Sequence, residues 1–331
     1  MKKLDFESEI KVAETKNPFQ RFVYNMNPAR LKEVDWDKWK KRNLNWNGVG
    51  RFGWSVLRFI LIVGISFMIL YPFLIKGIVS FMSTNDLVDK TVMYLPREGS
   101  TYFIERAMLN MEYWPALINT ILLSLVVAAL ELIVSSLVGY GFARFNFKGK
   151  NVLFLMVIMT LIIPSQTIMI PLFIRFRFFI GGISLLNTFW PLAVLAMTGL
   201  GLKNGLYIYM MRQFFRGMPK ELEMSAYIDG AGPFKTFVLI MLPNAMNMMI
   251  TVFLFAFTWQ WTDTTYNKML MPKMQILTNT IMNVTKSVTD ILQAQALNDT
   301  ASLLLILPLL LVFLVAQRYF IQSIERSGLV E

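Results

Sequence analysis

Side chains able to do chemistry are few in this chain of 331 residues, and the best-spaced set lies in the polar segment 212–243. The chain has no histidine and no cysteine, which excludes thiol nucleophiles, imidazole bases and the usual zinc ligand sets. Carboxylates elsewhere are scattered, without the paired setting that acid–base catalysis needs. No GxxxxGK[ST] loop is present to hold a nucleotide phosphate. The sequence therefore predicts a protein that is not an enzyme and has no cofactor or metal on this chain.

Segment 212–243 is expected to form a helix, a turn and a second helix. Pro219 suits the first turn of a helix, and Glu221 and Glu223 complement the positive N-terminal end of that helix. The pair Asp229-Gly230 is a turn signal. Pro233 then starts a second helix, which is predicted to run into the next apolar segment.

The first of these helices has one small and apolar face. That face contains Met218, Leu222, Ser225 and Ala226. A short helix of this kind, held by a sharp turn, has the form of a docking element for a groove on a partner. The alternative is an interfacial helix that rests on lipid, and the spacing leaves both open.

Long apolar segments must position this loop. The chain is 55% hydrophobic and only 16% charged. Crossing a hydrocarbon core takes roughly 17–25 residues, and soluble core helices do not need such lengths repeatedly. Membrane-spanning helices are predicted at about 57–76, 117–143, 152–174, 183–211, 243–262 and 299–320.

The distribution of basic residues predicts the orientation. Residues 1–55 carry 12 Lys and Arg against 7 Asp and Glu, and the short connection Arg144–Lys150 carries three basic residues. The positive-inside rule then places both termini in the cytoplasm. The expected fold is an all-α, multi-pass cell-membrane protein with six transmembrane helices. The N-terminal segment is expected either to lie on the anionic cytoplasmic leaflet, with a short helix after Asn27-Pro28, or to form a basic tail.

Segment 212–243 also carries a resemblance to a known family. It resembles the conserved cytoplasmic loop of ABC importer permeases, which reads E-A-A, two residues, D-G, and then a helix ending in L-P. Matching positions here hold Ala226, Asp229, Gly230, Ala231, Gly232, Leu242 and Pro243. Further motifs resemble the carbohydrate-type, maltose-related subfamily: Gly139–Asn151, Trp261-Thr262-Asp263 and Ala316–Phe320. The resemblance covers about 113–325 and departs at Met224 and Ser225, where the family has glutamate and alanine.

The resemblance implies a type I ABC importer permease that forms half of a translocation pathway. Its partners would be a second, homologous permease in a heterodimer, two ATPase subunits, an extracytoplasmic sugar-binding protein and the lipid bilayer, with no nucleic acid. The implied ATPase-coupling residues are Glu221, Leu222, Glu223, Met224, Ser225, Ala226, Asp229, Gly230, Ala231, Gly232 and Pro243. With Met224 at the family glutamate, the polar contact to the ATPase is expected to be absent or supplied by Glu223.

The same resemblance divides the chain into four parts. Residues 1–55 form a basic N-terminal segment, and 56–112 the first transmembrane helix with an extracytoplasmic loop. Residues 113–320 form the permease core, and 321–331 a cytoplasmic tail.

Polar and aromatic residues in or near the spans are candidates for the substrate path. They are Asn119, Glu131, Gln166, Lys203, Asn247 and Trp261. A lone charge inside a bilayer is costly, so one hypothesis pairs Glu131 with Lys203. The alternative has Lys203 reaching the interface and Glu131 bonded to polar neighbours such as Ser135. Most such polar groups bond between helices, and aromatic residues near span ends often form interfacial belts.

Two other classes of function remain at this point. A stand-alone secondary transporter or channel would need no docking helix. A membrane enzyme would need clustered catalytic groups, which the sequence lacks. The sequence does not identify the sugar or the partner chains.

Overall fold

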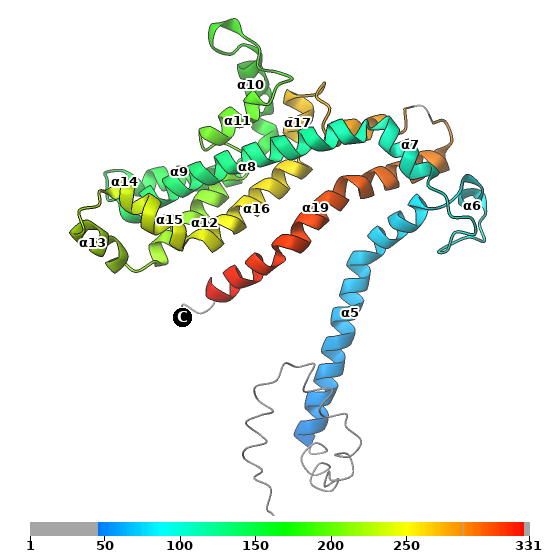
Figure 1. Cartoon of the computed structure of the whole chain (residues 1–331), viewed down its shortest axis with the longest axis horizontal. Coiled ribbons are helices and arrows are strands. Elements are labelled where there is room, and N and C mark those ends of the chain that lie inside the picture. The colour runs from blue at the N-terminus through cyan, green and yellow to red at the C-terminus, as the bar shows by residue number, and fades with distance from the viewer. Residues whose placement is uncertain (1–45, 287, 328–331) are drawn as a thin grey trace, which may run out of the picture. The chain divides into compact units, whose positions relative to one another are not determined.

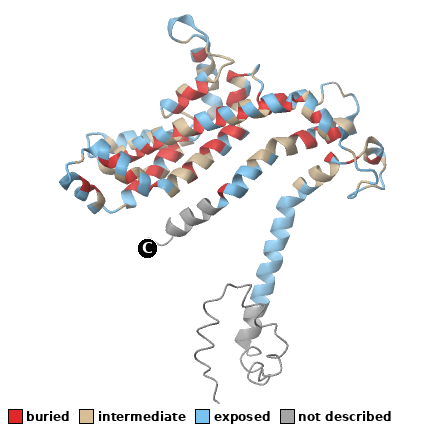
Figure 2. Ribbon diagram, viewed as in Figure 1, coloured by how far each residue is buried: buried red, intermediate tan, exposed pale blue. Residues whose placement is uncertain are grey.

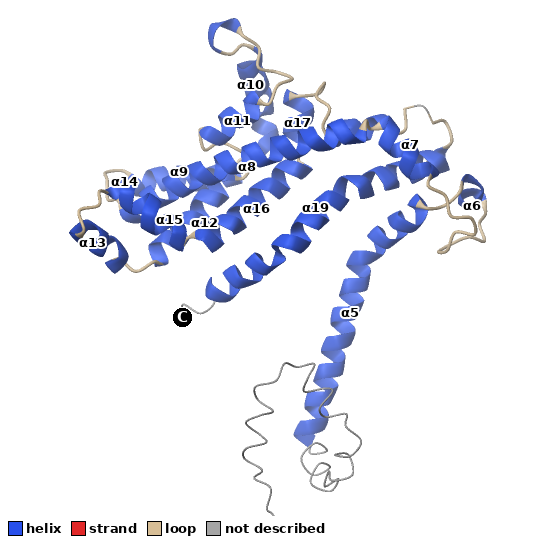
Figure 3. Cartoon of the chain, in the orientation of Figure 1, coloured by secondary structure: helices blue, strands red, loops and turns tan. Residues whose placement is uncertain are grey.

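The computed structural model describes residues 46–286 and 288–327 and divides the chain into two units, 1–72 and 73–331. The predictions for the N-terminal segment before Trp46 and for the last four residues lie outside the described residues. The described part is helical, and its one bridge of strand type joins Met82 to Gly99 (Figure 3). This agrees with the all-α prediction.

Helix α5 (Trp46–Ser80) begins in the first unit and contains Pro72, where that unit ends. Within this helix, Gly53–Ser80 is long and apolar enough to cross a membrane. It includes the predicted span 57–76.

In the second unit, helix α8 (Tyr113–Arg144) is the central element. It packs against α11 (Trp190–Met197), α12 (Asn204–Gly217) and α16 (Met246–Thr262) (Figure 1). Buried residues follow α8 along its length (Figure 2). A Cβ atom added at Gly139 would lie 2.7 Å from the Met211 Cβ, so a glycine is needed for α8 and α12 to approach this closely.

Three helices are long and apolar enough to span a membrane, and two bent helix pairs raise the number to five among the described residues. The segments Tyr113–Arg144 and Ile291–Gln317 correspond to the predicted spans 117–143 and 299–320. The second of these is part of α19 (Ile291–Ser327), which packs against α7 (Tyr102–Asn110) and α16.

The bent pairs correspond to the third and fifth predicted spans. Helices α9 (Lys150–Ile162) and α10 (Ser165–Arg177) meet at 101°, because Pro164 forces the residue before it out of the helical region. The segments Pro233–Asn244 and Met246–Thr262 meet at 80°, after a π-helical turn (Phe237–Met241) and Pro243. The expectation that the helix started by Pro233 runs directly into the fifth span is therefore wrong.

The fourth predicted span, 183–211, is not one helix. It covers α11 and the first part of α12, separated by a break at 198–203. Gly199 has φ +77° and Lys203 has φ +62°, and neither angle fits a right-handed helix. Within a membrane, backbone amides freed by such a break are tolerated only where protein or a wet cavity surrounds them.

Short helices complete the second unit. They are α6 (Thr84–Val88), the 3₁₀ turns Ile180–Gly182 and Ile281–Asn283, α13 (Glu221–Ile228), α14 (Pro233–Thr236), α15 (Leu242–Asn244), α17 (Thr265–Leu270) and α18 (Leu277–Thr280).

Candidate functional site

The loop between α12 and α16 has the predicted helix–turn–helix form. Helix α13 begins two residues after Pro219, and Pro233 is at the start of α14. Between them Gly230 has φ +78°, a left-handed conformation that a side chain would strain. The Ala231 N–H donates to the Ala226 carbonyl at 2.9 Å and closes the turn. The glycine of the predicted D-G turn is thus required by the backbone.

The inner face of α13 is attached to the C-terminal end of α8 through Glu223. The Tyr140 hydroxyl donates to Glu223 Oε1 at 2.7 Å, and Arg144 Nε lies 3.1 Å from Glu223 Oε2. Arg144 also donates from Nη2 to the Met218 carbonyl at 2.7 Å. Both charged side chains of this pair are buried. Glu223 therefore holds the loop in place within the chain.

This geometry corrects two sequence-based expectations. The Glu223 carboxylate is used internally, so it does not replace the missing family glutamate on the surface. Ala226 is only 3% exposed and faces inward, so it is not available to a partner. Both residues hold α13 in place instead of forming its exposed surface.

The outer face of α13 is apolar. Met224 is 58% exposed and Ile228 is 86% exposed, with Tyr227 exposed on the same helix and Phe234 exposed just beyond the turn. We call Met224, Tyr227, Ile228 and Phe234 the outer face. Other loop residues predicted from sequence that are also exposed are Glu221, Ser225, Asp229, Gly230 and Gly232, whereas Leu222 and Ala231 are half-buried. Exposed apolar side chains gathered in a polar loop are typical of an interaction site. Pro243 lies apart from this face, in α15.

A second group of functional candidates surrounds the break at 198–203. Glu131 is buried in the middle of α8 with its carboxyl group beside the Leu202 backbone within that break, and its Oε1 has no hydrogen-bond partner among the described residues. The hypothesis that Glu131 pairs with Lys203 is wrong for this structure, because the Lys203 ammonium lies over the Trp259 ring, 5.2 Å from its centroid. The alternative partner is wrong as well, since Ser135 donates to the Leu132 carbonyl of its own helix.

A cavity of about 820 Å³ lies beside this break, between α9, α10 and the start of α12. It brings together two of the sequence-predicted path residues, Gln166 and Lys203. Arg175 and Asn204 also line it and were not among the sequence candidates. In the sequence, only the charge of Arg175 and the position of Asn204 next to Lys203 pointed to these two residues. The bend at Pro164 and the break at 198–203 bring them to one place.

The remaining path candidates lie elsewhere. Trp261 is 1% exposed and its indole N–H donates to the Leu305 carbonyl at 3.0 Å, so it is part of the core. Asn119 donates from its side chain to the Gln275 carbonyl at 2.8 Å. Asn247 is half-buried on α16, and its carbonyl accepts from the Thr251 hydroxyl. None of these three lines the cavity.

Most of the chain is similar in sequence to known transport proteins. Residues 132–326 match a family model described as binding-protein-dependent transport system inner membrane component. The arabinooligosaccharides transport system permease protein AraQ of Halalkalibacterium halodurans is 27% identical over 291 residues, 82% of this chain and 96% of the relative. The galactooligosaccharides transport system permease protein GanQ of Bacillus subtilis is 26% identical over 286 residues, 85% and 97% of the two chains.

The fold is also similar to a solved structure. It matches a chain of a bacterial ABC transporter involved in the import of the acidic polysaccharide alginate, with a TM-score of 0.66. The match covers 81% of this chain and 96% of the other, at 19% sequence identity. At that identity the likeness shows the fold alone.

Proposed function

Since the chain belongs to the family of binding-protein-dependent transport system inner membrane components, we propose that it is a permease subunit of an ATP-driven carbohydrate importer. Two relatives that align over nearly their whole length are named as permeases for oligosaccharides, which supports the substrate class. Membership of the family decides against a stand-alone transporter. It implies an extracytoplasmic binding protein and an ATPase as partners.

We extend the proposal to the membrane arrangement and to the subunits. The chain crosses the membrane six times with both termini in the cytoplasm, α11 and α12 together forming the fourth crossing. It pairs with a second, homologous permease. Residues 113–320 form the permease core, with 1–55, 56–112 and 321–331 as the N-terminal segment, the first span with its outer loop, and the tail.

The observation that carries the proposal is the outer face of α13. A helix whose inner face is fixed by a buried ion pair and whose outer face is apolar suits insertion into a groove of the ATPase. Motion of the ATPases would then be transmitted through α13 to α8, because Glu223 joins the two helices. In the membrane, the cavity beside the break at 198–203 is the proposed part of the sugar path.

Changing the outer face tests this coupling. Ile228→Asp should abolish co-purification of the cognate ATPase, because an exposed apolar contact is replaced by a charge that would be desolvated in the groove. Gly230→Val should do the same by straining the turn. Met224→Glu restores the family residue and should be tolerated. The measurement is the amount of ATPase retained by the tagged, membrane-inserted chain.

Lys148→Gln is the control, because Lys148 is exposed in the connection between α8 and α9 and lies outside segment 212–243. It should retain the ATPase. Normal retention by both Ile228→Asp and Gly230→Val would refute the docking role.

A further inference from the structure

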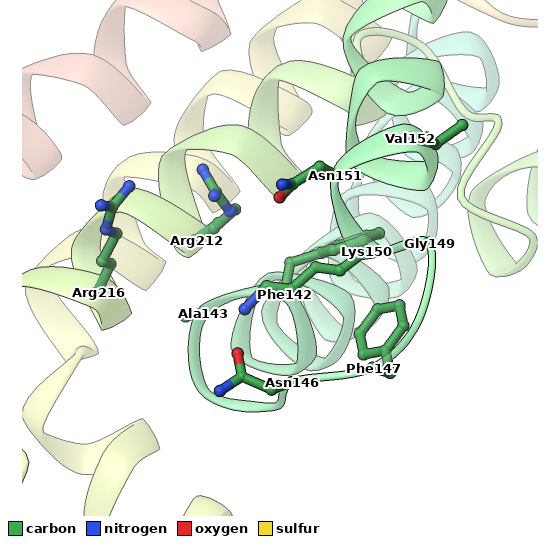
Figure 4. A pocket seen from close by; sticks show the side chains of 10 residues that line it. All are labelled: Phe142, Ala143, Asn146, Phe147, Gly149, Lys150, Asn151, Val152, Arg212 and Arg216. Atoms are coloured by element: carbon green, nitrogen blue, oxygen red, sulfur yellow. The ribbon is translucent and has the colours of Figure 1, made fainter.

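A pocket of about 660 Å³ lies between the end of α8, the start of α9 and the last turns of α12 (Figure 4). Three cationic residues line it: Lys150, Arg212 and Arg216. They come from two helices and approach closely enough that Lys150 interacts electrostatically with both arginines. No carboxylate lines the pocket.

These positive charges lack acidic partners among the described residues. Lys150 donates to the Phe145 carbonyl at 2.8 Å, and the Arg212 guanidinium lies over the Phe154 ring, 3.9 Å from its centroid. The buried Nε of Arg212 has no hydrogen-bond partner within the described part of the chain. A guanidinium stays charged, so these neighbouring cations repel one another, and an anion in the pocket would relieve that repulsion.

We infer that this pocket binds the phosphate of an anionic phospholipid headgroup from the inner leaflet. The inference rests on the membrane orientation proposed above, which puts this end of α8 in the cytoplasm. Basic pockets between transmembrane helices on that side are suited to anionic headgroups. Arginine forks match phosphate oxygens in a way that lysine does not.

The surroundings favour a lipid over an acidic protein surface. Helix α9 leads away from the pocket and has no buried residue, and Val152, Leu153, Leu155 and Met156 are exposed along it. Such a strip can accommodate an acyl chain beside the headgroup. Helix α13, which the proposal assigns to the ATPase, packs against α14 and the π-helical turn and contributes no residue to the pocket.

The test uses the purified full-length chain in detergent, with phosphatidylglycerol and phosphatidylcholine competing at equal concentration. Native mass spectrometry measures the ratio of the two bound lipids. The double variant Arg212→Gln/Arg216→Gln should lower the preference for phosphatidylglycerol by about fivefold for each arginine removed. Arg212→Lys/Arg216→Lys keeps the charge but removes the guanidinium forks, and it should keep part of that preference.

Lys220→Gln/Lys235→Gln is the matched control. It removes the same charge from the same side of the protein, at residues that do not line the pocket. It should leave the preference unchanged. An unchanged preference in Arg212→Gln/Arg216→Gln, an equal loss in the control, or an equal loss in the lysine variant would each overturn the inference.

Adding inorganic phosphate to the assay tests whether the pocket binds a lipid headgroup or free phosphate. If the pocket is a lipid site, phosphatidylglycerol should stay bound in millimolar phosphate. Displacement of phosphatidylglycerol by phosphate would overturn the lipid assignment. The assay contains neither ATPase nor sugar. Failure of the coupling proposal would therefore appear as normal ATPase retention by Ile228→Asp and Gly230→Val with the lipid preference intact, and the two failures are distinguishable.

Discussion

Glu131 shows how a single buried carboxyl can determine local structure inside a membrane protein. It lies in the middle of α8 with its carboxyl group beside the backbone of Leu202, in the break between α11 and α12, and its Oε1 has no hydrogen-bond partner among the described residues. An unsatisfied amide at that depth would cost several kcal/mol, on the order of the penalty for burying a polar group without a partner. Glu131 is therefore a positioning residue for the break, and Lys203 remains directed toward Trp259.

This role predicts a difference between two substitutions of Glu131. Glu131→Gln keeps an acceptor for Leu202 and should unfold at the temperature of the original chain. Glu131→Leu removes the acceptor and should destabilise the protein by about 1–3 kcal/mol. Thermal unfolding of the purified chain in detergent measures both. Ser135→Ala is the control, because that hydroxyl bonds only within α8. Equal stability of the Gln and Leu variants would contradict the role.

Among the elements, α13 depends on α8 for its position. The contact consists of the buried pair Arg144–Glu223, supported by the hydroxyl of Tyr140. Removing one member of a buried pair leaves the other charge without compensation, which costs about 3–5 kcal/mol. The outer face of α13 is therefore presented at a defined angle only while this pair is intact.

The attachment predicts non-additive effects at the pair. Glu223→Ala and Arg144→Ala should each expose segment 212–243 to limited proteolysis and reduce ATPase retention. The double variant should lose less than the sum of the two, with a coupling energy of about 0.5–3 kcal/mol. Glu98→Ala controls for removal of an exposed carboxylate outside segment 212–243. Additive losses would show that the two side chains act independently.

As a whole molecule, the chain is a transport component that needs its partners for energy. It lacks a phosphate-cradling loop, and its family membership implies a separate ATPase. The purified chain alone should therefore hydrolyse no ATP. A complex with the cognate ATPase should hydrolyse ATP faster when the sugar-loaded binding protein is added. Phosphate release measures both rates, and sustained hydrolysis by the chain alone would contradict the assignment.

The helical fold and the helix–turn–helix of segment 212–243 could be predicted from the sequence, because the signals for them are local. Long apolar segments require helices, since a bilayer offers no other partner for backbone groups. Pro233 and Asp229-Gly230 determine the helix–turn–helix because each acts through its own backbone angles. The family motifs around this turn were therefore sufficient to identify the family that residues 132–326 match.

Only the tertiary structure decided which side chains face inward. Glu223 and Met224 are neighbours in sequence, yet one forms a buried ion pair and the other lies on the surface, because Arg144 from another helix reaches only the first. The partners of Glu131 and Lys203 were likewise not determined by composition. They depend on the break at 198–203, which turns Lys203 toward Trp259 and leaves a backbone amide beside Glu131. Such contacts join residues distant in sequence, and no local propensity encodes them.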